Sequence, residues 1–271
     1  MPTLEKIAIN VRAVTDAEVR FLWENGWVKL PELISRKDAA MMLARAKKLM
    51  GMDGAALVAE PSNIAGVGWY EDYEMASSDD EVLRSFVMHE QLGLNAARML
   101  GRNSAIRAMV DSLAVKLPTS DAVHGSAATP FHQDQTLHPW DTHSISYWMA
   151  LDEVRPEEGS MQFFSGSQKF GLLGRAHKLF EYPRLKAECP LTEPNHLLPG
   201  DATAHISSTV HGAGQNVGKN PRWGFITAYL PADALYTGTA SRYTDGLGLE
   251  VGKPLDHPRF PIISEKVSEF S

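Results

Sequence analysis

The sequence has a single cysteine, Cys189, among its 271 residues, so it cannot form an internal disulfide. A chain without disulfides suits a reducing compartment. It also lacks any run of basic residues, and its formal net charge is −7 at pH 7. Proteins that bind nucleic acid or an anionic membrane surface usually gather Lys and Arg into clusters. We therefore expect neither kind of partner.

Long apolar runs are absent as well. No stretch approaches the roughly 20 apolar residues that a membrane-spanning helix needs, and residues 1–12 contain no apolar segment of the kind found in signal peptides. We expect no membrane helix, no signal peptide and a cytoplasmic location. No repeat of about 20–50 residues is visible either, which argues against a repeat architecture.

The chain does contain enough apolar sequence to build one sizeable core. Apolar residues make up 44% of it, an ordinary share for a globular protein. All-β domains often reach this length, so we expect a single domain over residues 1–271.

Helical patterns are concentrated in the N-terminal part of the chain. Residues 15–18 read Thr-Asp-Ala-Glu, which has the form of a capping box, and Gly26 stands where that helix would end. Ser35 would cap a second helix that runs to about residue 50. Apolar spacing predicts a third helix over 81–101, and residues 51–80 have the composition of a loop.

Short alternating segments replace the helical pattern from residue 111 onward. Strands are predicted at 111–117, 143–151 and 160–164, in a segment ending near residue 211, and at 222–230. Turn residues separate these segments, which favours an antiparallel barrel or double-sheet jelly roll. We expect a mainly β fold with a core at about 111–230, a helical layer and a tail over 231–271.

The candidate chemistry centres on His132-Gln133-Asp134. Residues two apart in a strand face the same side, about 7 Å apart, so this His and this Asp can converge on one cation. Two His and one carboxylate form the facial triad that holds non-haem Fe(II) and leaves coordination positions open. The second His has to come from another strand. His211, which we expect to close a strand before a Gly-rich turn, is the candidate.

Arg222 starts the strand after that turn, so a hairpin would bring it beside His211. Arginine can hold a carboxylate through two parallel hydrogen bonds. A 2-oxoacid that chelates a metal needs such a partner at its far end. His132, Asp134, His211 and Arg222 together therefore predict a site for a metal ion and a dicarboxylate.

The chain resembles the phytanoyl-CoA dioxygenase family of Fe(II)/2-oxoglutarate-dependent oxygenases over nearly its whole length. The similar segments are 25–28, 132–134, 147–152, 158–160, 165–167, 199–201 and 211–216. The resemblance implies a double-stranded β-helix (jelly roll) fold and iron ligands at His132, Asp134 and His211. It also implies that Arg222 binds 2-oxoglutarate, that Trp148 lines the same pocket, and that O2 is the other co-substrate.

The resemblance further implies a reaction. Related halogenases have Gly or Ala where this chain has Asp134, so hydroxylation of a small molecule, with release of succinate and CO2, is expected. Epimerisation, desaturation or ring formation at the same site is the alternative, and a non-catalytic jelly-roll binding protein is another. Gln168, Ala213 and Trp223 replace residues that are common in the family, and none of them is a predicted metal ligand.

Several neighbours of the motif have simpler interpretations. Gln133 would face away from the ligands and is interpreted as a structural hydrogen-bonding residue. His205 is interpreted as a histidine of the core or beside the site, rather than as a fourth ligand. His138 and residues 69–70 are candidate substrate contacts, and Lys116 is a candidate inward-facing residue.

Overall fold

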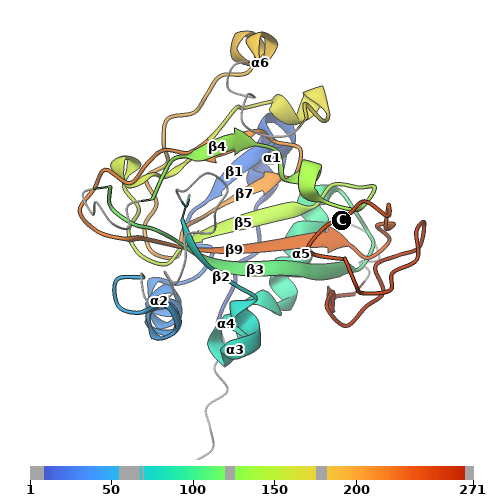
Figure 1. Cartoon of the computed structure of the whole chain (residues 1–271), viewed down its shortest axis with the longest axis horizontal. Helices are drawn as coiled ribbons and strands as arrows, with labels where there is room; N and C mark the ends of the chain where they lie inside the picture. The colour runs from blue at the N-terminus through green and yellow to red at the C-terminus, as the bar shows by residue number, and fades with distance from the viewer. Residues whose placement is uncertain (1–8, 55–67, 69, 120–125, 175–181, 266–271) are drawn as a thin grey trace, which may run out of the picture.

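The computed structural model describes residues 9–54, 68, 70–119, 126–174 and 182–265 (Figure 1). Its helices are α1 (Asp16–Asn25), α2 (Arg36–Met50), α3 (Ala76–Asp79), α4 (Glu81–Val87), α5 (Glu90–Leu100) and α6 (Pro183–Glu188). Its strands are β1 (Trp27–Leu30), β2 (Glu71–Glu74), β3 (Ile106–Lys116), β4 (Thr129–His132), β5 (Ile145–Ala150), β6 (Met161–Phe163), β7 (Ala202–Ile206), β8 (His211–Ala213), β9 (Arg222–Pro231) and β10 (Ile262–Ser264). Short 3-10 turns are η1 (Asp134–Leu137), η2 (Pro156–Glu158) and η3 (Ser167–Phe170).

The strands form two antiparallel sheets. The larger sheet has the order β1-β7-β5-β9-β3-β10, with β2 paired to β3, and the smaller has the order β4-β8-β6. Helices α2 to α5 lie on one side of the larger sheet, and β4 lies on the other (Figure 1). The expected jelly roll with a helical layer is thus confirmed, whereas the single-domain extent over residues 1–271 stays a prediction.

Strand β5 shows how sequence alternation builds the two faces of the larger sheet. Ile145, Tyr147 and Met149 are buried in the core that the sheet shares with the helices, and the Tyr147 hydroxyl donates to the Leu92 carbonyl in α5 at 3.3 Å. Trp148 points to the opposite face and packs in a separate cluster, because successive side chains of a strand alternate. That second face is the one that carries the candidate site.

Helix α1 begins as the sequence predicts. The Thr15 hydroxyl accepts a hydrogen bond from the Glu18 amide at 3.2 Å, and the Glu18 carboxylate accepts one from the Thr15 amide at 2.7 Å. Gly26 ends the helix with φ at 80°, a conformation that glycine adopts without steric cost. The capping box and the terminal glycine therefore fix both ends.

The helix predicted over 81–101 is in fact two helices, α4 and α5. The chain breaks at Met88 and His89, and the His89 Nδ1 atom accepts a hydrogen bond from the Gln91 amide at 3.1 Å. This histidine therefore caps α5, which apolar spacing alone does not reveal.

The loop expected over 51–80 contains β2 and α3. Asp111 in β3 accepts hydrogen bonds from the Ser77 amide at 2.9 Å and from the Ser77 hydroxyl at 2.6 Å, which attaches α3 to the sheet. Strand β3 also begins at Ile106, earlier than predicted, because its first residues pair with β9 and β10. These partners are distant in sequence.

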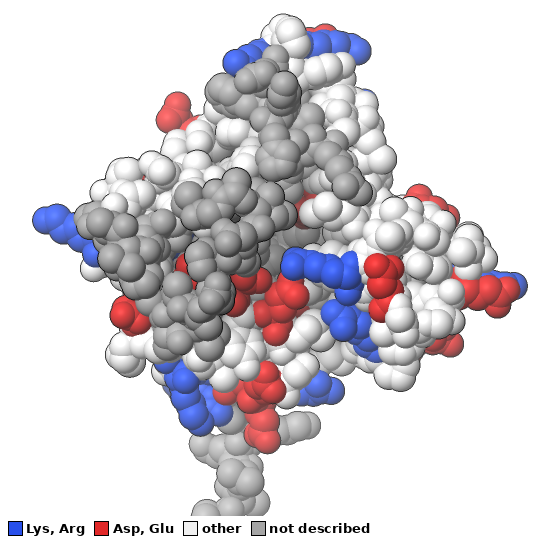
Figure 2. Space-filling view, viewed as in Figure 1, with Lys and Arg blue, Asp and Glu red and all other residues white. Residues whose placement is uncertain are grey.

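The molecular surface carries charges of both signs. In Figure 2, Lys and Arg side chains are interspersed with Asp and Glu side chains, and the surface is hollowed near the centre of this face. No helix within the described part of the chain is long and apolar enough to cross a membrane.

Candidate metal centre

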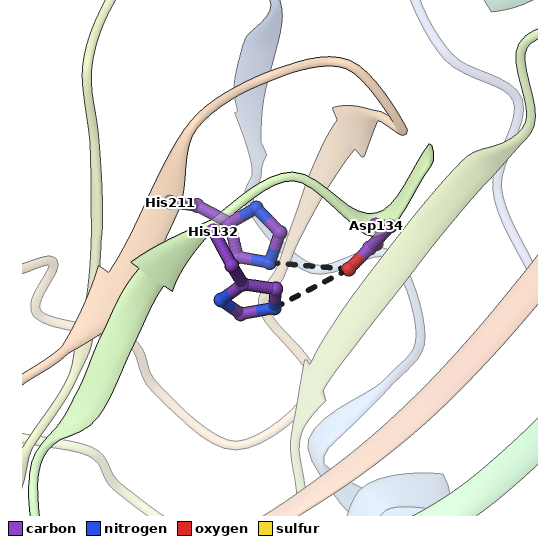
Figure 3. A group of neighbouring side chains, drawn as sticks. All are labelled: His132, Asp134 and His211. Atoms are coloured by element: carbon purple, nitrogen blue, oxygen red, sulfur yellow. Dashed lines mark ion pairs between the residues drawn. The ribbon is translucent and has the colours of Figure 1, made fainter. Parts of the chain in front are cut away.

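His132 and Asp134 do meet, although not on one strand as predicted. His132 is the last residue of β4, and Asp134 is the first residue of η1. The strand has only four residues, and its pairing with β8 is irregular between Thr129 and His132. Even so, the His132 Nε2 atom lies 3.4 Å from the Asp134 Oδ1 atom (Figure 3).

Gln133 stabilises the turn between these two side chains. It is fully buried, and its Nε2 atom donates to the carbonyls of Gly171 at 2.8 Å and Ser208 at 2.6 Å. Its Oε1 atom accepts from the Leu173 amide at 2.8 Å. The interpretation of Gln133 as a structural hydrogen-bonding residue is therefore confirmed.

His211 reaches the same point from a different strand position than predicted. Strand β7 stops at Ile206, a turn follows, and His211 begins β8 rather than closing a strand. Pairing of β4 with β8 sets His211 opposite His132, and the His211 Nε2 atom lies 3.6 Å from the Asp134 Oδ1 atom (Figure 3). The ligand atoms of these three residues all lie within 4.8 Å of one another.

The hydrogen bonds of the two imidazoles suit a metal ion. The Nδ1 atom of His132 lies 2.8 Å from the Pro130 carbonyl, and that of His211 lies 3.0 Å from the Thr209 carbonyl. A carbonyl accepts only, so each Nδ1 carries a proton, and the Nε2 atom of each ring in its neutral form presents a lone pair. Ligands about 2.0–2.2 Å from a metal and at right angles lie about 3 Å apart. The two separations between an imidazole Nε2 atom and the Asp134 Oδ1 atom, 3.4 Å and 3.6 Å, are slightly longer than this, and all three ligand atoms lie within 4.8 Å of one another, so one ion fits among them after a small inward movement.

The electrostatics of the cluster favour an ionised Asp134. Burial would raise the pKa of this carboxyl, but His211, His132 and His205 outweigh it and hold the pKa well below its usual value. Burial, with His205 and His132 adding to it, holds the pKa of His211 well below its usual value. The side chains of His132 and Asp134 remain 21% and 20% exposed. The cluster therefore combines a carboxylate with an unprotonated His211 and keeps access from outside.

Arg222 is the first residue of β9, which lies between β5 and β3 in the larger sheet. It does not form the predicted hairpin with His211, because His211 belongs to β8 of the smaller sheet. Its side chain is buried and donates to the Gly159 carbonyl, and its guanidinium lies 4.8 Å from the centroid of the Trp148 ring. Burial lowers the pKa of Arg222 to about 10, so the group stays positive at neutral pH. Its buried Nε atom has no hydrogen-bond partner among the described residues. A carboxylate would satisfy both the charge and this donor.

Strand β5 connects the cluster with Arg222. The Ser146 hydroxyl donates to the Asp134 Oδ2 atom at 2.9 Å, and Trp148 stacks on Arg222. Ser146 and Trp148 lie on one face of β5, about 7 Å apart. One small dicarboxylate can therefore span the space between the cluster and the guanidinium.

Lys116 faces inward, as expected. It lies opposite Arg222 in the register of β3 and β9, and its side chain is fully buried. Its Nζ atom forms hydrogen bonds with the Ala127 carbonyl at 2.9 Å, the Thr129 hydroxyl at 3.1 Å and the Gly214 carbonyl at 2.8 Å. Burial, together with the charge of Arg222, lowers the pKa of Lys116 to about 6. The side chain therefore ties together three segments that surround the guanidinium.

Two of the substitutions relative to the family lie away from the cluster. Trp223 is buried among the core residues on the opposite face of the sheet, because it follows Arg222 directly in the strand. The amide of Gln168 donates to the Trp23 carbonyl at 3.1 Å. Neither departure changes the groups around Asp134.

Sequence reasoning missed the contribution of the C-terminal segment. Arg242 forms an ion pair with Glu74 of β2 at 2.6 Å, and the Tyr243 ring centroid lies 6.4 Å from that of His138. Burial raises the pKa of Tyr70 to about 12, with smaller effects of Asp72, Tyr243 and Asp134. No sequence motif marks these C-terminal residues. By contrast, the alternation of side chains in β5 correctly predicted that Ser146 lies on the same face of the strand as Trp148. Trp69 lies outside the described residues.

A family model described as phytanoyl-CoA dioxygenase (PhyH) matches residues 22–224 of this chain. Among curated proteins, the dioxygenase olcK of Penicillium canescens is 30% identical over 116 residues, which are 40% of this chain and 35% of that protein. The chain therefore matches about a third of that relative's length.

Solved structures of similar fold cover nearly the whole molecule. The epimerase SnoN, in complex with Fe3+, alpha ketoglutarate and nogalamycin RO, has a TM-score of 0.75 at 23% identity over 92% of this chain and 98% of its own. The carbocyclase SnoK from nogalamycin biosynthesis has a TM-score of 0.75 at 23% identity over 93% and 99%. EctD from S. alaskensis, with 2-oxoglutarate and 5-hydroxyectoine, has a TM-score of 0.68 at 16% identity over 87% and 88%. These likenesses establish the fold.

Proposed function

Because the chain belongs to the phytanoyl-CoA dioxygenase family, we propose that it is an Fe(II)/2-oxoglutarate-dependent dioxygenase that oxidises a small molecule. The observation that carries the proposal is the convergence of His132, Asp134 and His211, whose ligand atoms lie within 4.8 Å of one another. When bound, Fe(II) with 2-oxoglutarate and O2 supplies the oxidising power to break a C–H bond, and succinate and CO2 are released.

The residues of the chain have distinct roles in this proposal. The Nε2 lone pairs of His132 and His211 and the Oδ1 atom of Asp134 hold the metal ion and leave other coordination positions open. Arg222 binds the distal carboxylate of 2-oxoglutarate. Trp148 covers one face of the guanidinium, and this keeps water from that side of the ion pair. The ion pair is stronger in such a desolvated setting than in water.

We propose that the substrate enters near His138, Tyr70 and Tyr243. Besides burial, the negative charge of Asp134 contributes to the raised pKa of Tyr70 and of Tyr243, which supports a position of both phenols near the cluster. Burial raises the pKa of both phenols, so each keeps its proton at neutral pH and can donate a hydrogen bond to a polar group of the substrate. We expect a small organic molecule as partner, with no nucleic acid or membrane partner. The single Cys189 supports a cytoplasmic location.

Hydroxylation is the reaction that we propose, since Asp134 takes the position that a halide would need. Epimerisation or ring formation is the second candidate, because proteins of the same fold include an epimerase and a carbocyclase. The mass of the product separates the candidates. A hydroxylated product gains one oxygen atom, and an epimer or a cyclised product gains none.

Turnover of 2-oxoglutarate tests the function without knowledge of the substrate. The protein is incubated with Fe(II), 2-oxoglutarate, O2 and ascorbate, and succinate is measured together with CO2. We expect slow succinate release by the unaltered chain and none by His132→Ala or Asp134→Ala. His143→Ala, which changes a histidine outside the cluster, is the control and should match the unaltered chain. Equal succinate release by all four proteins would refute the proposal.

A further inference from the structure

The two oxygens of Asp134 have different surroundings. The Oδ1 atom faces the Nε2 atoms of His132 and His211, at 3.4 Å and 3.6 Å. The Oδ2 atom accepts hydrogen bonds from the Ser146 hydroxyl at 2.9 Å and the His205 Nε2 atom at 3.1 Å. Only one oxygen therefore points to the place where the two imidazole lone pairs converge.

The two donors are built into the larger sheet as a pair. Ser146 in β5 lies directly opposite His205 in β7 in the antiparallel register, so both side chains leave the same face side by side. Both residues are 4% exposed. Side chains fixed on neighbouring strands and buried in this way hold a constant position, whereas Asp134 itself follows the end of β4 and lies in a 3-10 turn. Ser146 and His205 of the larger sheet can thus orient the carboxylate of Asp134, whose own backbone segment holds it less firmly.

The ring of His205 is held in the orientation that this role requires. Its centroid lies 4.1 Å from that of His211 and 5.7 Å from that of Phe163. Its Nδ1 atom is buried and has no hydrogen-bond partner among the described residues. A proton on Nδ1 would be left without an acceptor, so the ring carries its proton on Nε2, where Asp134 accepts it.

We propose that Ser146 and His205 form a clamp that holds the Oδ2 atom and makes Asp134 a one-oxygen metal ligand. Two-oxygen binding by Asp134 would occupy a further coordination position, and that position would be lost to 2-oxoglutarate or O2. Ser146 and His205 are therefore positioning residues for the metal site. The inference rests on the proposed function, because it presumes that His132, Asp134 and His211 bind a metal ion.

The test measures Co(II) binding by calorimetry in the absence of 2-oxoglutarate, with circular dichroism as a check of folding. His205→Phe and Ser146→Ala remove one donor each, whereas His205→Gln and Ser146→Thr each keep one. Loss of a hydrogen-bond partner of a ligand typically costs about 10–100-fold in metal affinity. We expect that loss for the first pair and less than about 3-fold for the second. The visible absorption of bound Co(II) should also change in the first pair, because the coordination geometry changes.

Two controls separate the possible failures. Ser144→Ala removes a hydroxyl that contacts His138 and not Asp134, and it should leave Co(II) affinity unchanged. Asp134→Ala should abolish binding. If Asp134→Ala binds Co(II) normally, the metal site itself is wrong, and the clamp falls with it. If Asp134→Ala loses binding while folded His205→Phe and Ser146→Ala retain full affinity, only the clamp is wrong. Equal losses in His205→Phe and His205→Gln would also overturn it, because the donor would then be irrelevant.

Discussion

Replacing Arg222 by methionine should weaken the binding of 2-oxoglutarate and little else. Methionine keeps much of the length of the side chain and its contact with Trp148, but it has no charge and no donor. The guanidinium is buried, its Nε atom has no partner among the described residues, and its ion pair with a carboxylate would be formed away from water. Loss of one partner of such a desolvated pair costs about 2–5 kcal/mol.

This free energy corresponds to a large change in affinity. At about 1.4 kcal/mol for each factor of ten, we expect the Kd of 2-oxoglutarate to rise by about 30- to 4,000-fold in Arg222→Met. Calorimetry with the Co(II)-loaded protein measures it directly. The Kd of Co(II) should not change, because Arg222 contacts none of the three candidate ligands.

Two comparisons make the result specific. Pyruvate, a 2-oxoacid without a distal carboxylate, should bind the unaltered chain and Arg222→Met equally. Arg107→Met removes another buried arginine, which donates to the Phe260 carbonyl and pairs with Asp256, and it should leave 2-oxoglutarate binding intact. An unchanged Kd for 2-oxoglutarate in Arg222→Met would refute the reasoning, and so would an equal loss of pyruvate affinity.

Two further changes test the structure around the site, and a third tests the start of α1. The pKa of Lys116 is about 6 in the folded chain but about 10.4 in the unfolded chain. Between pH 6 and about pH 10.4, the unfolded chain therefore binds more protons than the folded chain. As a result, the free energy of unfolding rises with pH in this range, by up to about 1.4 kcal/mol per pH unit. Lys116→Met should flatten this rise in urea titrations at acidic and alkaline pH, and an unaltered slope would contradict the assignment. Gly224→Ala would set a Cβ atom 2.2 Å from Trp148 Cζ2. We therefore expect this variant to lose about 1–3 kcal/mol of stability and to bind 2-oxoglutarate more weakly. Gly214→Ala is the control, because its Cβ atom would meet nothing within 4 Å, and it should change neither property. Thr15→Ala removes the cap of α1 and should lower the free energy of unfolding by about 1 kcal/mol, as measured by denaturant titration. The affinity for Co(II) should not change. A change in both stability and Co(II) affinity would contradict a purely local role of Thr15.

The sequence predicted local features well where the chemistry is local. A capping box and a glycine specify both ends of α1, and alternation specifies which side chains of β5 meet the helices and which meet the smaller sheet. The buried role of Gln133 also followed from its place between two side chains that face the other way. Each of these inferences depends on residues a few positions apart, whose relation is fixed by backbone geometry.

Features that depend on distant partners were harder to predict. The position of His211 at the start of β8 results from pairing with β4 and β6, and the true neighbours of Arg222 are β3 and β5 rather than the strand before it. Register between strands is set by packing across the whole sheet, which a single sequence does not display. For the same reason, nothing in the tail indicated that Arg242 would pair with Glu74.

The convergence of His132, Asp134 and His211 on one ferrous ion is tested most directly by an anaerobic titration with Fe(II) in the presence of 2-oxoglutarate. The visible charge-transfer absorption of the complex reports binding. We expect the absorption to saturate at one Fe(II) per chain and to be lost in His132→Ala, Asp134→Ala and His211→Ala. Saturation at the same stoichiometry in any of these variants would contradict the assignment of that residue, and saturation in all three would place the iron elsewhere.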